Sequence, residues 1–324
     1  MITTAVILAA GRGSRLKEIT ATRSKAMVPI AGKPMISRVM ESLRDAGINR
    51  FVIVAAPHDM ELRSFFSGDS TVSVLTQQVP RGSGDALKVC AGHIATDFLV
   101  CACDSLIPVD DISGLMEAHT RTEACVSVGV MEVPAGLSLA SRSVVRMEGD
   151  RILDIIEKPQ PHERLSNITA LPLYVLSPEI FAELEKLQLS ARGEYELPEA
   201  FRSVIASGRR VSAARISQRD DLTNSADLLA LNEQFLNAQT PPVQIDPSVE
   251  VPADVTIHAP VLIEQGVVLG AGCEVGPYVY LERGVVVESG AKLSHVVATR
   301  GARVVGSVHN IVVTGEGGHV ARRS

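Results

Sequence analysis

A glycine-rich loop with two arginines follows the first apolar run of the chain, residues 5–10. Gly11 and Gly13 are separated by one residue, and this spacing lets backbone N–H groups turn towards one point to form a concave anion site. Arg12 and Arg15 add positive charge, and Arg15 can bind a phosphate through two parallel hydrogen bonds. These residues alone leave open a simpler interpretation, a tight turn with solvated arginines.

The loop matches neither of two better-known glycine loops. A dinucleotide-binding fingerprint has a third glycine where this chain has Leu16, and a Walker A loop ends in Gly-Lys-Ser/Thr, whereas Lys17 follows Leu16 here. A second basic cluster follows at residues 24–35. The two blocks read L-A-A-G-x-G-S-R-L and S-K-A-M-V-P-I-x-G-K-P-M. Together they resemble the signature of the nucleotidyltransferases that activate sugar 1-phosphates.

The resemblance extends over about residues 3–237 through six ordered motifs. It implies an enzyme that transfers a nucleotidyl group from a nucleoside triphosphate (NTP) to a sugar 1-phosphate, giving a nucleoside diphosphate (NDP) sugar and pyrophosphate. The attack would be in line, with no covalent intermediate. A protein base is not required, because a phosphate monoester is already largely ionised at neutral pH.

The first motifs supply the phosphate-binding candidates. Ala10, Gly11 and Gly13 are expected to bind the nucleotide through the backbone. Arg15 is expected to hold the β- and γ-phosphates, which leave as pyrophosphate. Lys25 resembles the family lysine that neutralises charge on the α-phosphate and on the incoming sugar phosphate. Arg15 and Lys25 are therefore the predicted catalytic residues.

Two aspartates are the predicted ligands of Mg²⁺. Asp104 follows an apolar strand pattern, and a carboxylate at the carboxyl edge of a sheet suits Mg²⁺, which binds one or two carboxylates plus substrate phosphates. Residues 221–229 resemble the family segment D-x-x-T-x-x-D-L-L, with Asn224 where threonine is usual. The resemblance makes Asp221 the second ligand, while Asp227 fits the start of a helix.

The base-binding candidates are in residues 77–86, which resemble the family segment Q-x-x-P-x-G-T-A-x-A. A glutamine amide offers one donor and one acceptor to a pyrimidine edge, so Gln77 is the predicted base reader and UTP or dTTP the favoured nucleotide. Gly82 would let the base approach the backbone, and Ser83 fits either a base contact or a helix N-cap. Ser83 and Gly84 replace the usual Thr-Ala, which leaves the base preference open.

Three further segments resemble the part of the family site that binds the sugar phosphate: E-K-P at residues 157–159, S-N at 166–167 and G-E-Y at 193–195. They predict four binding residues, Glu157, Lys158, Asn167 and Glu194. Tyr174 matches the strand that follows S-N, but Pro172 stands where the family has glycine. Because proline removes a backbone donor, we expect a sugar pocket that differs from the usual hexose type.

These motifs are distributed over an alternating pattern of strands and helices. The strands are expected at Thr4–Ala9, Arg50–Ala55, Thr71–Thr76 and Asp97–Cys103. Helices are expected at Pro34–Ala46, Met60–Phe66, Ser83–His93, from Ser177 as N-cap, and at Ser225–Asn237. Such alternation predicts an α/β fold with a mostly parallel, Rossmann-like sheet, whose carboxyl edge binds the ligand.

The periodicity changes to six residues after position 244. Aliphatic residues recur from Ile245 at every sixth position to Leu293, and the same register continues through Thr299, Val305 and Ile311. A period of six predicts a left-handed parallel β-helix of about four coils. The expected division is therefore a catalytic domain at 1–237, a linker at 238–244, and a β-helix with a C-terminal tail at 245–324.

Composition limits the partners and the location. A net charge of −6 and a pI near 5.8 argue against non-specific nucleic-acid binding. No apolar run approaches the roughly 18 residues of a membrane span, and the N-terminal run lacks the features of a secretory signal. Five cysteines at unremarkable spacings are interpreted as buried, unpaired fillers. We therefore expect a cytoplasmic protein with no membrane partner.

The predicted β-helix domain at 245–324 has three possible roles. We expect it to make a homo-oligomer, since solenoid faces pack well against copies of themselves. The alternatives are an effector site and a second, acyltransferase activity with His295 or His309 as base.

Two alternatives to the main function also stay open. One is a cytidylyltransferase that acts on a phosphorylated alcohol, and the other is a catalytically silent regulatory or scaffold subunit of the same fold.

Overall fold

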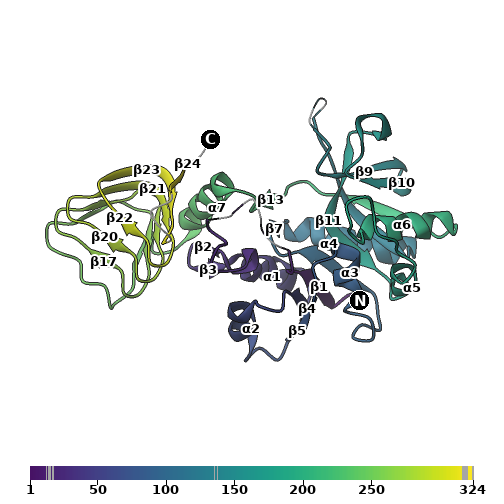
Figure 1. The fold of residues 1–324 in the computed structure, drawn as a ribbon, viewed down its shortest axis with the longest axis horizontal. Coiled ribbons are helices and arrows are strands. Elements are labelled where there is room, and N and C mark those ends of the chain that lie inside the picture. Colours follow the sequence, from purple (N-terminus) through teal and green to yellow (C-terminus); the bar gives the residue numbers. More distant parts are fainter. Residues whose placement is uncertain are drawn as a thin grey trace. The chain divides into compact units, whose positions relative to one another are not determined.

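The structure is a computed structural model, and it describes residues 1–11, 13, 16, 18–134, 136, 138–315 and 320–322. The chain forms two compact units, each built from two segments, whose elements are labelled in Figure 1. Residues 1–12 and 39–219 form the sheet unit, and residues 13–38 and 220–324 form the β-helix unit. These units do not follow the order of the predicted domains, because residues 13–38 join the C-terminal segment.

The sheet unit contains a mixed sheet with nine strands in the described part of the chain. Their order is β5 (Val72–Thr76), β4 (Arg50–Ala55), β1 (Thr4–Leu8), β6 (Phe98–Ala102), β11 (Ile168–Leu176), β8 (Val126–Glu132), β12 (Val211–Arg215), β10 (Arg151–Glu157) and β9 (Ser143–Glu148). The first four are parallel, β11 is antiparallel to both neighbours, and β9 pairs back onto β11. The predicted α/β class with parallel strands is confirmed.

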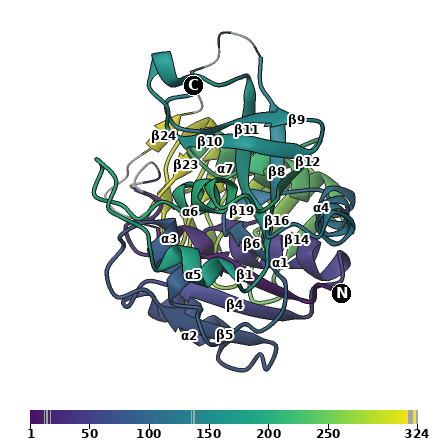
Figure 2. The same ribbon diagram turned by 90° about the vertical axis from the view of Figure 1, so that its right-hand side faces the viewer.

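Helices cover both faces of this sheet (Figure 2). The helices that begin after residue 39 are α2 (Met60–Phe66), α3 (Ser83–Lys88), α4 (Val109–Thr122), α5 (Ile180–Leu184) and α6 (Leu197–Ala206). The helices α3, α5 and α6 pack together on one face, whereas α4 packs on β8 and β12 from the other. Smaller elements are the 3-10 turn η3 (Pro161–Glu163) and β7 (Ser105–Leu106).

The predicted N-cap at Ser177 is wrong, and the cap that was one of two alternatives for Ser83 is excluded. The N-cap of α3 is Gly82, and the Ser83 hydroxyl instead accepts a hydrogen bond of 3.1 Å from the Leu197 amide at the start of α6. The helix α5 begins at Ile180, and the hydroxyl of Ser177 donates to the Cys125 sulfur at 3.4 Å. In both cases a partner far away in the sequence takes the hydroxyl that local pattern assigns to a cap. The helix α3 also ends at Lys88, five residues before the predicted end.

Pro172 lies in a long irregular stretch of the pairing between β11 and β8. The register runs from Ala170 opposite Val130 to Tyr174 opposite Val128, so β11 contains extra residues there. Because proline has no N–H to donate to a strand neighbour, such a bulge is where a sheet tolerates it. The proline therefore marks a local change in the strand that begins just after Asn167.

The C-terminal part of the β-helix unit is a parallel β-helix, as predicted. Two long columns of strands involve β14 (Val243–Ile245), β15 (Thr256–Ile257), β16 (Val261–Ile263), β18 (Glu274–Val275), β19 (Val279–Leu281), β21 (Lys292–Ala298) and β23 (Ser307–Val313). A third column is β17 (Val268–Leu269), β20 (Val286–Val287) and β22 (Arg303–Val304), and β24 (Val320–Arg322) pairs antiparallel with β23. The inward side chains form one continuous core.

The six-residue register is confirmed at Ile245 and from Ile257 to Leu293, and beyond Leu293 the positions Thr299 and Ile311 are buried whereas Val305 is not. The coil that includes His295 is one residue shorter, so Val304 rather than Val305 pairs beside Val287, and Val305 is 66% exposed. Val251 was also expected inside, but it precedes the first strand of its column and is 42% exposed. A strict period therefore holds only while successive coils have equal length.

The remaining elements of the β-helix unit come from residues 13–38 and 220–238. They are η2 (Lys25–Met27), β2 (Pro29–Ile30), β3 (Lys33–Pro34), β13 (Asp220–Asp221) and α7 (Ser225–Ala238), while α1 (Met35–Asp45) continues into the sheet unit. The Ala31 amide donates to the buried Asn232 side chain of α7 at 2.8 Å, and the Arg38 guanidinium lies 4.1 Å from the Phe235 ring centre. Ala31 and Arg38 thus pack on α7.

Candidate functional site

The predicted nucleotide loop begins where β1 ends. Ala10 is buried and Gly11 is exposed with open space around it. Gly13 has a φ of +59°, a conformation that side chains disfavour, and a Cβ there would lie 3.4 Å from the Lys25 Cβ. Gly13 therefore lets the loop pass close to the lysine segment. The predicted catalytic Arg15 lies outside the described residues.

Lys25 opens the 3-10 turn η2 and is half-buried. The turn is held by backbone hydrogen bonds from Met27 to Ser24 and from Val28 to Lys25. The Ser24 hydroxyl is buried with no hydrogen-bond partner in the described part of the chain. A buried hydroxyl without a partner is unfavourable unless a ligand or water satisfies it. The Ser24 hydroxyl, next to Lys25 in the chain, is therefore a polar group that can bind a ligand or water.

Strand ends bring the other nucleotide candidates of the sheet unit to one edge. Ala10 and Gly11 follow β1, Gln77 follows β5 and Asp104 follows β6, and these parallel strands all end at the same edge. Asp104 is half-buried, as is Asp221 in β13 of the β-helix unit. Ligands of α/β sheets bind at this edge, and Asp104 lies there; its role as a metal ligand stays a prediction.

The helix after Asp221 begins with a complete capping box. The Asn224 side chain accepts from the amides of Ala226 and Asp227, and the Asp227 carboxylate accepts from the Asn224 amide at 3.0 Å and the Thr223 amide at 2.7 Å. Asp227 is thus a helix-start residue, as expected. Asn224, where the family usually has threonine, serves as the N-cap of α7, so the substitution keeps a capping residue there.

Gln77 is 4% exposed, and its amide nitrogen is fully used. The Nε2 atom donates to the Gly82 carbonyl at 3.2 Å and to the Asp85 carboxylate at 2.8 Å. The carboxamide oxygen is the remaining hydrogen-bonding atom of this side chain, and it can only accept. Gln77 therefore holds the loop before α3 and leaves an acceptor for a ligand.

The loop at Gly82 is docked against the backbone of Tyr195. A Cβ at Gly82 would lie 2.5 Å from the Tyr195 carbonyl oxygen, and φ is +106° there. The Gly84 amide donates to that carbonyl at 2.8 Å, and the Tyr195 amide donates to the Arg81 carbonyl at 2.7 Å. The predicted base segment and the predicted sugar segment at 193–195 are therefore joined backbone to backbone. This contact gives a direct steric reason for glycine at position 82.

Three of the predicted sugar-phosphate residues lie together. The Lys158 ammonium lies 3.7 Å from a carboxylate oxygen of Glu157 and 3.9 Å from one of Glu194. The Ser143 hydroxyl donates to the other oxygen of Glu157. The side chains of Lys158 and Glu194 stay 34% and 46% exposed, so a ligand can reach them. A cation between two carboxylates can bind a phosphate and neighbouring hydroxyls together.

Asn167 binds elsewhere among the described residues: its side-chain oxygen accepts from Arg164, and its carbonyl accepts from the Val133 amide at 2.9 Å. Tyr174, which follows it in β11, is a core residue whose ring packs edge-on against Phe201 at 5.0 Å. Burial raises the pKa of the Tyr174 phenol well above its usual value. Tyr174 therefore acts as packing rather than as a proton donor or acceptor.

Sequence reasoning missed Arg192 and Glu196, which hold the sugar segment in place. Glu196 is 5% exposed and binds the Arg192 guanidinium at 2.6 and 2.7 Å, and the same guanidinium donates to the Glu157 carbonyl at 3.4 Å. The signal in the sequence is an Arg and a Glu four residues apart around Gly-Glu-Tyr. It is weak, because surface pairs at this spacing are common.

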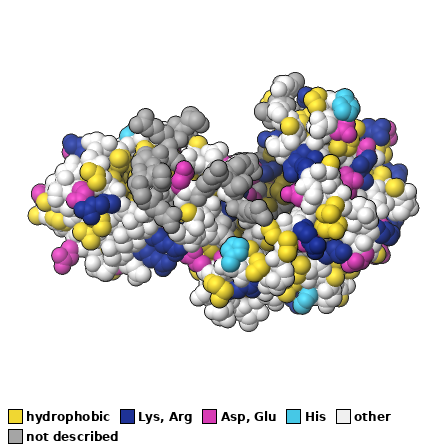
Figure 3. All heavy atoms as spheres, in the orientation of Figure 1, with side chains coloured by type: hydrophobic (Ala, Val, Ile, Leu, Met, Phe, Trp, Pro, Cys, Tyr) yellow, Lys and Arg dark blue, Asp and Glu magenta, His cyan; other side chains and the backbone are white. Residues whose placement is uncertain are grey.

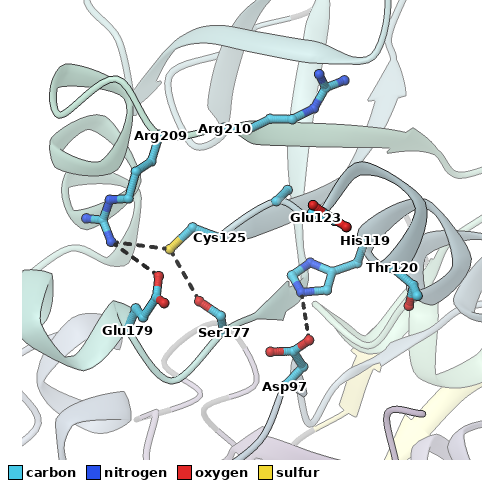
Figure 4. A pocket seen from close by; sticks show the side chains of 10 residues that line it. Asp97, His119, Thr120, Glu123, Cys125, Ser177, Glu179, Arg209 and Arg210 are labelled. Carbon is cyan, nitrogen blue, oxygen red and sulfur yellow. Dashed lines mark hydrogen bonds and ion pairs between the residues drawn. The ribbon is translucent and has the colours of Figure 1, made fainter.

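A separate polar pocket of about 500 Å³ lies at the opposite edge of the sheet (Figure 4). Cys125, which precedes β8, accepts from Ser177 and, at 3.7 Å, from Arg209. Arg209 is also bound to Glu183 at 2.5 Å, and Arg210 to Asp150 at 2.5 Å.

The five cysteines, all in the described part of the chain, are buried and unpaired, as predicted. Burial raises the pKa of Cys90 to about 12, and burial together with the nearby Asp104 raises that of Cys101 to about 12. In the pocket of Figure 4, burial lowers the pKa of His119 against the opposing effect of Asp97. Cys90 and Cys101 are therefore packing residues and poor nucleophiles in the folded protein.

The described surface and helices set further limits. Figure 3 shows a face on which Lys and Arg side chains are interspersed with Asp and Glu side chains rather than gathered by sign. Among the described helices, none has the length and apolar character that a membrane crossing requires. Nor do three or more His, Cys, Asp or Glu side chains within the described residues come together as a metal-binding group.

Comparisons with known proteins agree with this fold. The chain is 30% identical over 234 residues to the bifunctional protein GlmU of Methanococcus maripaludis. The aligned region covers 72% of this chain and 54% of GlmU. The chain is 31% identical over 217 residues to the UTP–glucose-1-phosphate uridylyltransferase AglF of Haloferax volcanii, covering 65% and 87%. A crystal structure of UDP-glucose pyrophosphorylase complexed with UDP-glucose has a TM-score of 0.66 at 24% identity, covering 74% of this chain and 100% of that one.

The extent of these matches defines what they establish. The chain spans about half the length of the GlmU proteins that it matches. The similarity to the solved pyrophosphorylase supports the fold. The family profile described as Nucleotidyl transferase matches residues 4–244, which include every predicted site residue. On this evidence from sequence and fold, the chain belongs to the nucleotidyl transferase family.

Proposed function

We propose that the protein transfers a nucleotidyl group from an NTP to a sugar 1-phosphate and releases pyrophosphate. Family membership over residues 4–244 supports the reaction class, and the relatives include a UTP–glucose-1-phosphate uridylyltransferase. The observation that carries the sugar phosphate assignment is the trio of Glu157, Lys158 and Glu194, with its ammonium 3.7 and 3.9 Å from the two carboxylates. Its residues come from two motifs that are more than thirty positions apart in the sequence.

In this reaction an oxygen of the sugar phosphate attacks the α-phosphorus, and the bond to the bridging oxygen of the pyrophosphate breaks. Lys25 would stabilise the charge that gathers on the α-phosphate, and Arg15 would hold the departing pyrophosphate. The backbone of Ala10, Gly11 and Gly13 would bind the triphosphate. The exchange balances without a covalent enzyme intermediate and without a protein base, since the attacking phosphate is already ionised.

Mg²⁺ is the proposed cofactor, and Asp104 and Asp221 are the proposed ligands. Two carboxylates plus phosphate oxygens of the substrate are the hard oxygen donors that Mg²⁺ prefers, so the donor set fits. When bound, the ion would offset negative charge on the phosphates. Asp104 ends a strand at the ligand-binding edge of the sheet, which supports its role, and the assignment of Asp221 rests on the motif that it begins.

The proposed preference for UTP or dTTP rests on Gln77. Both hydrogens of its amide nitrogen are directed to Gly82 and Asp85, which leaves the carboxamide oxygen as an acceptor. Uracil and thymine present an N–H at the middle of their pairing edge, whereas cytosine presents a bare nitrogen acceptor there. An acceptor on the protein therefore favours uracil or thymine.

We also propose that Asn167 binds the sugar phosphate, that the protein forms a homo-oligomer through its β-helix, and that it acts in the cytoplasm. Exposed valines such as Val268, 55% exposed, and Val305 support self-association, because apolar side chains on a solenoid face favour contact with another copy. Light scattering on the purified protein tests the oligomeric state.

The decisive experiment is a pyrophosphate-release screen of five NTPs against a panel of sugar 1-phosphates, with and without Mg²⁺. We expect release with UTP or dTTP, loss of release with EDTA, and loss in Asp104→Ala. Asp110→Ala, which removes an exposed carboxylate at the start of α4, is the control and should keep wild-type activity. Lack of release with every pair would refute the proposal and favour a silent subunit. Release only with CTP and a phosphorylated alcohol would favour the cytidylyltransferase.

A further inference from the structure

Arg23, two residues before Lys25, is buried in an ion pair with the β-helix. Its guanidinium lies 2.8 Å from a carboxylate oxygen of Glu282, and the two side chains are only 3% and 7% exposed. Removing two charged side chains from water is unfavourable, and this cost is recovered only when the charges are paired well. An arginine in a loop is ordinarily solvated, so the burial of Arg23 calls for another explanation. Both residues belong to the β-helix unit, so the contact is internal to one compact body.

A second connection runs beside the ion pair. The other carboxylate oxygen of Glu282 accepts from the Arg300 amide at 2.8 Å, and the Arg300 guanidinium donates to the Thr22 carbonyl at 3.1 Å. Glu282 follows β19 and Arg300 follows β21, so two successive coils take part. Residues 22 and 23 are thereby fixed to the β-helix through both a side chain and the backbone.

The fixed residues lead directly to the proposed catalytic lysine. Arg23 is followed by Ser24, the N-cap of η2, and then by Lys25. Thr20, on the other side of the anchor, donates its hydroxyl to the Gly13 carbonyl at 3.3 Å, and a Cβ added to Gly13 would lie 3.4 Å from the Lys25 Cβ. The phosphate loop and the lysine are thus both within a few residues of the anchor.

We propose that Arg23 and Glu282 are positioning residues, through which the β-helix holds Lys25 in its working geometry. This inference rests on the proposed function, since it takes Lys25 as the group that stabilises charge on the α-phosphate. The β-helix then takes part in nucleotidyl transfer as the support of a catalytic residue. Neither Arg23 nor Glu282 touches the reacting atoms in this arrangement.

The first test removes the ion pair and measures turnover. Arg23→Gln should lower kcat for pyrophosphate release by about 10- to 100-fold, because a displacement of about 1 Å in a catalytic group has effects of this size. The KM for the sugar 1-phosphate should change little, since the trio at Lys158 is untouched. Glu274→Gln is the matched control, because it removes a glutamate from an exposed β-helix ion pair with Lys292, and should leave kcat unchanged.

Rescue separates positioning from a general loss of stability. Arg23→Lys keeps the charge and should keep more activity than Arg23→Gln, and the double variant Arg23→Glu/Glu282→Arg should recover activity relative to either single change. Each variant is first checked for a wild-type circular dichroism spectrum and a cooperative melting curve. If the charge-reversed pair folds but is as slow as the single variants, pairing does not position the lysine and the proposal is wrong.

A double-mutant cycle with Lys25 tests the route of the effect. If Arg23 acts through Lys25, Arg23→Gln should change kcat less than about twofold in a Lys25→Ala background, because the residue to be positioned is absent. If Arg23→Gln slows the Lys25→Ala protein as much as it slows the wild type, Arg23 acts elsewhere and the proposal fails. A wild-type protein without any transferase activity would instead refute the proposed function, so the two failures are distinguishable.

Discussion

At the scale of single residues, the proposed activity depends on side chains whose chemistry is set by their neighbours. Lys158 is the clearest case, because its ammonium lies between the carboxylates of Glu157 and Glu194 and still reaches solvent. Alone, Glu157 and Lys158 read as an ordinary surface ion pair in the sequence. The addition of a carboxylate from a distant segment turns the pair into a site that can bind a phosphate and hydroxyls together.

Replacing Lys158 by methionine should raise the KM for the sugar 1-phosphate by 10-fold or more. The physical reason is that the phosphate loses its one cation in this trio, whereas the NTP keeps its own candidates Gly11, Gly13 and Lys25. The KM for the NTP should therefore stay within about twofold. Initial rates of pyrophosphate release measure both constants. Lys88→Met, which breaks the exposed pair with Glu185, is the control; a rise in both KM values for Lys158→Met would contradict the assignment.

The cysteines give a prediction about chemical modification. Because the pKa of Cys90 and that of Cys101 are raised to about 12, almost no thiolate is present at pH 8, and the thiolate is the reactive form. Native protein treated with iodoacetamide at pH 8 should keep both residues unmodified, and the same treatment in urea should alkylate them. Peptide mass spectrometry reads the two sites. Rapid modification in the native state would show that these buried segments open readily.

His119 gives the pH dependence of stability. Burial lowers its folded-state pKa below the ordinary value of about 6.5, so the unfolded chain binds the proton more readily as pH falls. The stabilising contribution is present above about pH 6.5 and is lost as the pH falls below it. His119→Gln should therefore reduce the loss of unfolding free energy between pH 7 and pH 5, measured by urea titration. His93→Gln, an exposed histidine, should leave that difference unchanged.

At the scale of elements, the contact between Gly82 and Tyr195 ties α3 to the segment that leads into α6. Gly82→Ala places a methyl group 2.5 Å from a backbone carbonyl at a φ of +106°, so either the loop or the 193–195 segment must shift. We expect a loss of about 1–3 kcal/mol of stability and a higher KM for both substrates. Gly92→Ala is the matched control, since its φ is +81° but no atom lies within 4 Å. Equal effects of both variants would show that strain alone is responsible.

The strands with regular patterns could be predicted from sequence, and contacts between distant segments could not. The strand Arg50–Ala55 and the helix Met60–Phe66 match their predicted bounds. A cap was predicted at Ser177 and was one of two alternatives at Ser83, because capping is a local pattern, whereas their hydroxyls bind Cys125 and Leu197. The six-residue period likewise identified the β-helix but gave no sign of the shortened coil at His295.

The predicted site residues show the same division. Motif spacing identifies Glu157, Lys158 and Glu194, and the structure brings these three together. Motif spacing gave no reason to single out Arg23, because a lone arginine in a polar loop has the same local pattern whether it is solvated or buried. Only the position of Glu282, more than two hundred residues later, distinguishes the two cases.

At the scale of the whole molecule, a family match that ends at residue 244 does not coincide with a compact unit. A chain cut after residue 244 keeps every motif but loses Glu282 and Arg300, the partners of residues 22 and 23. We expect this truncated chain to release little or no pyrophosphate. The full-length double variant Val268→Asp/Val305→Asp keeps the coils and should stay active even if it is monomeric. Full activity of the truncated chain would show that residues 13–38 hold their geometry without the β-helix.

The discontinuous β-helix unit also has a consequence for synthesis of the protein. Residues 26–30 are buried in the finished fold, and the backbone beside them at Ala31 binds Asn232, which is 201 positions further along the chain. On the ribosome this apolar stretch therefore emerges long before its partners exist. Until α7 and the coils have been synthesised, this exposed apolar stretch can aggregate with other apolar surfaces. We expect chaperones to bind the nascent chain mainly during that interval.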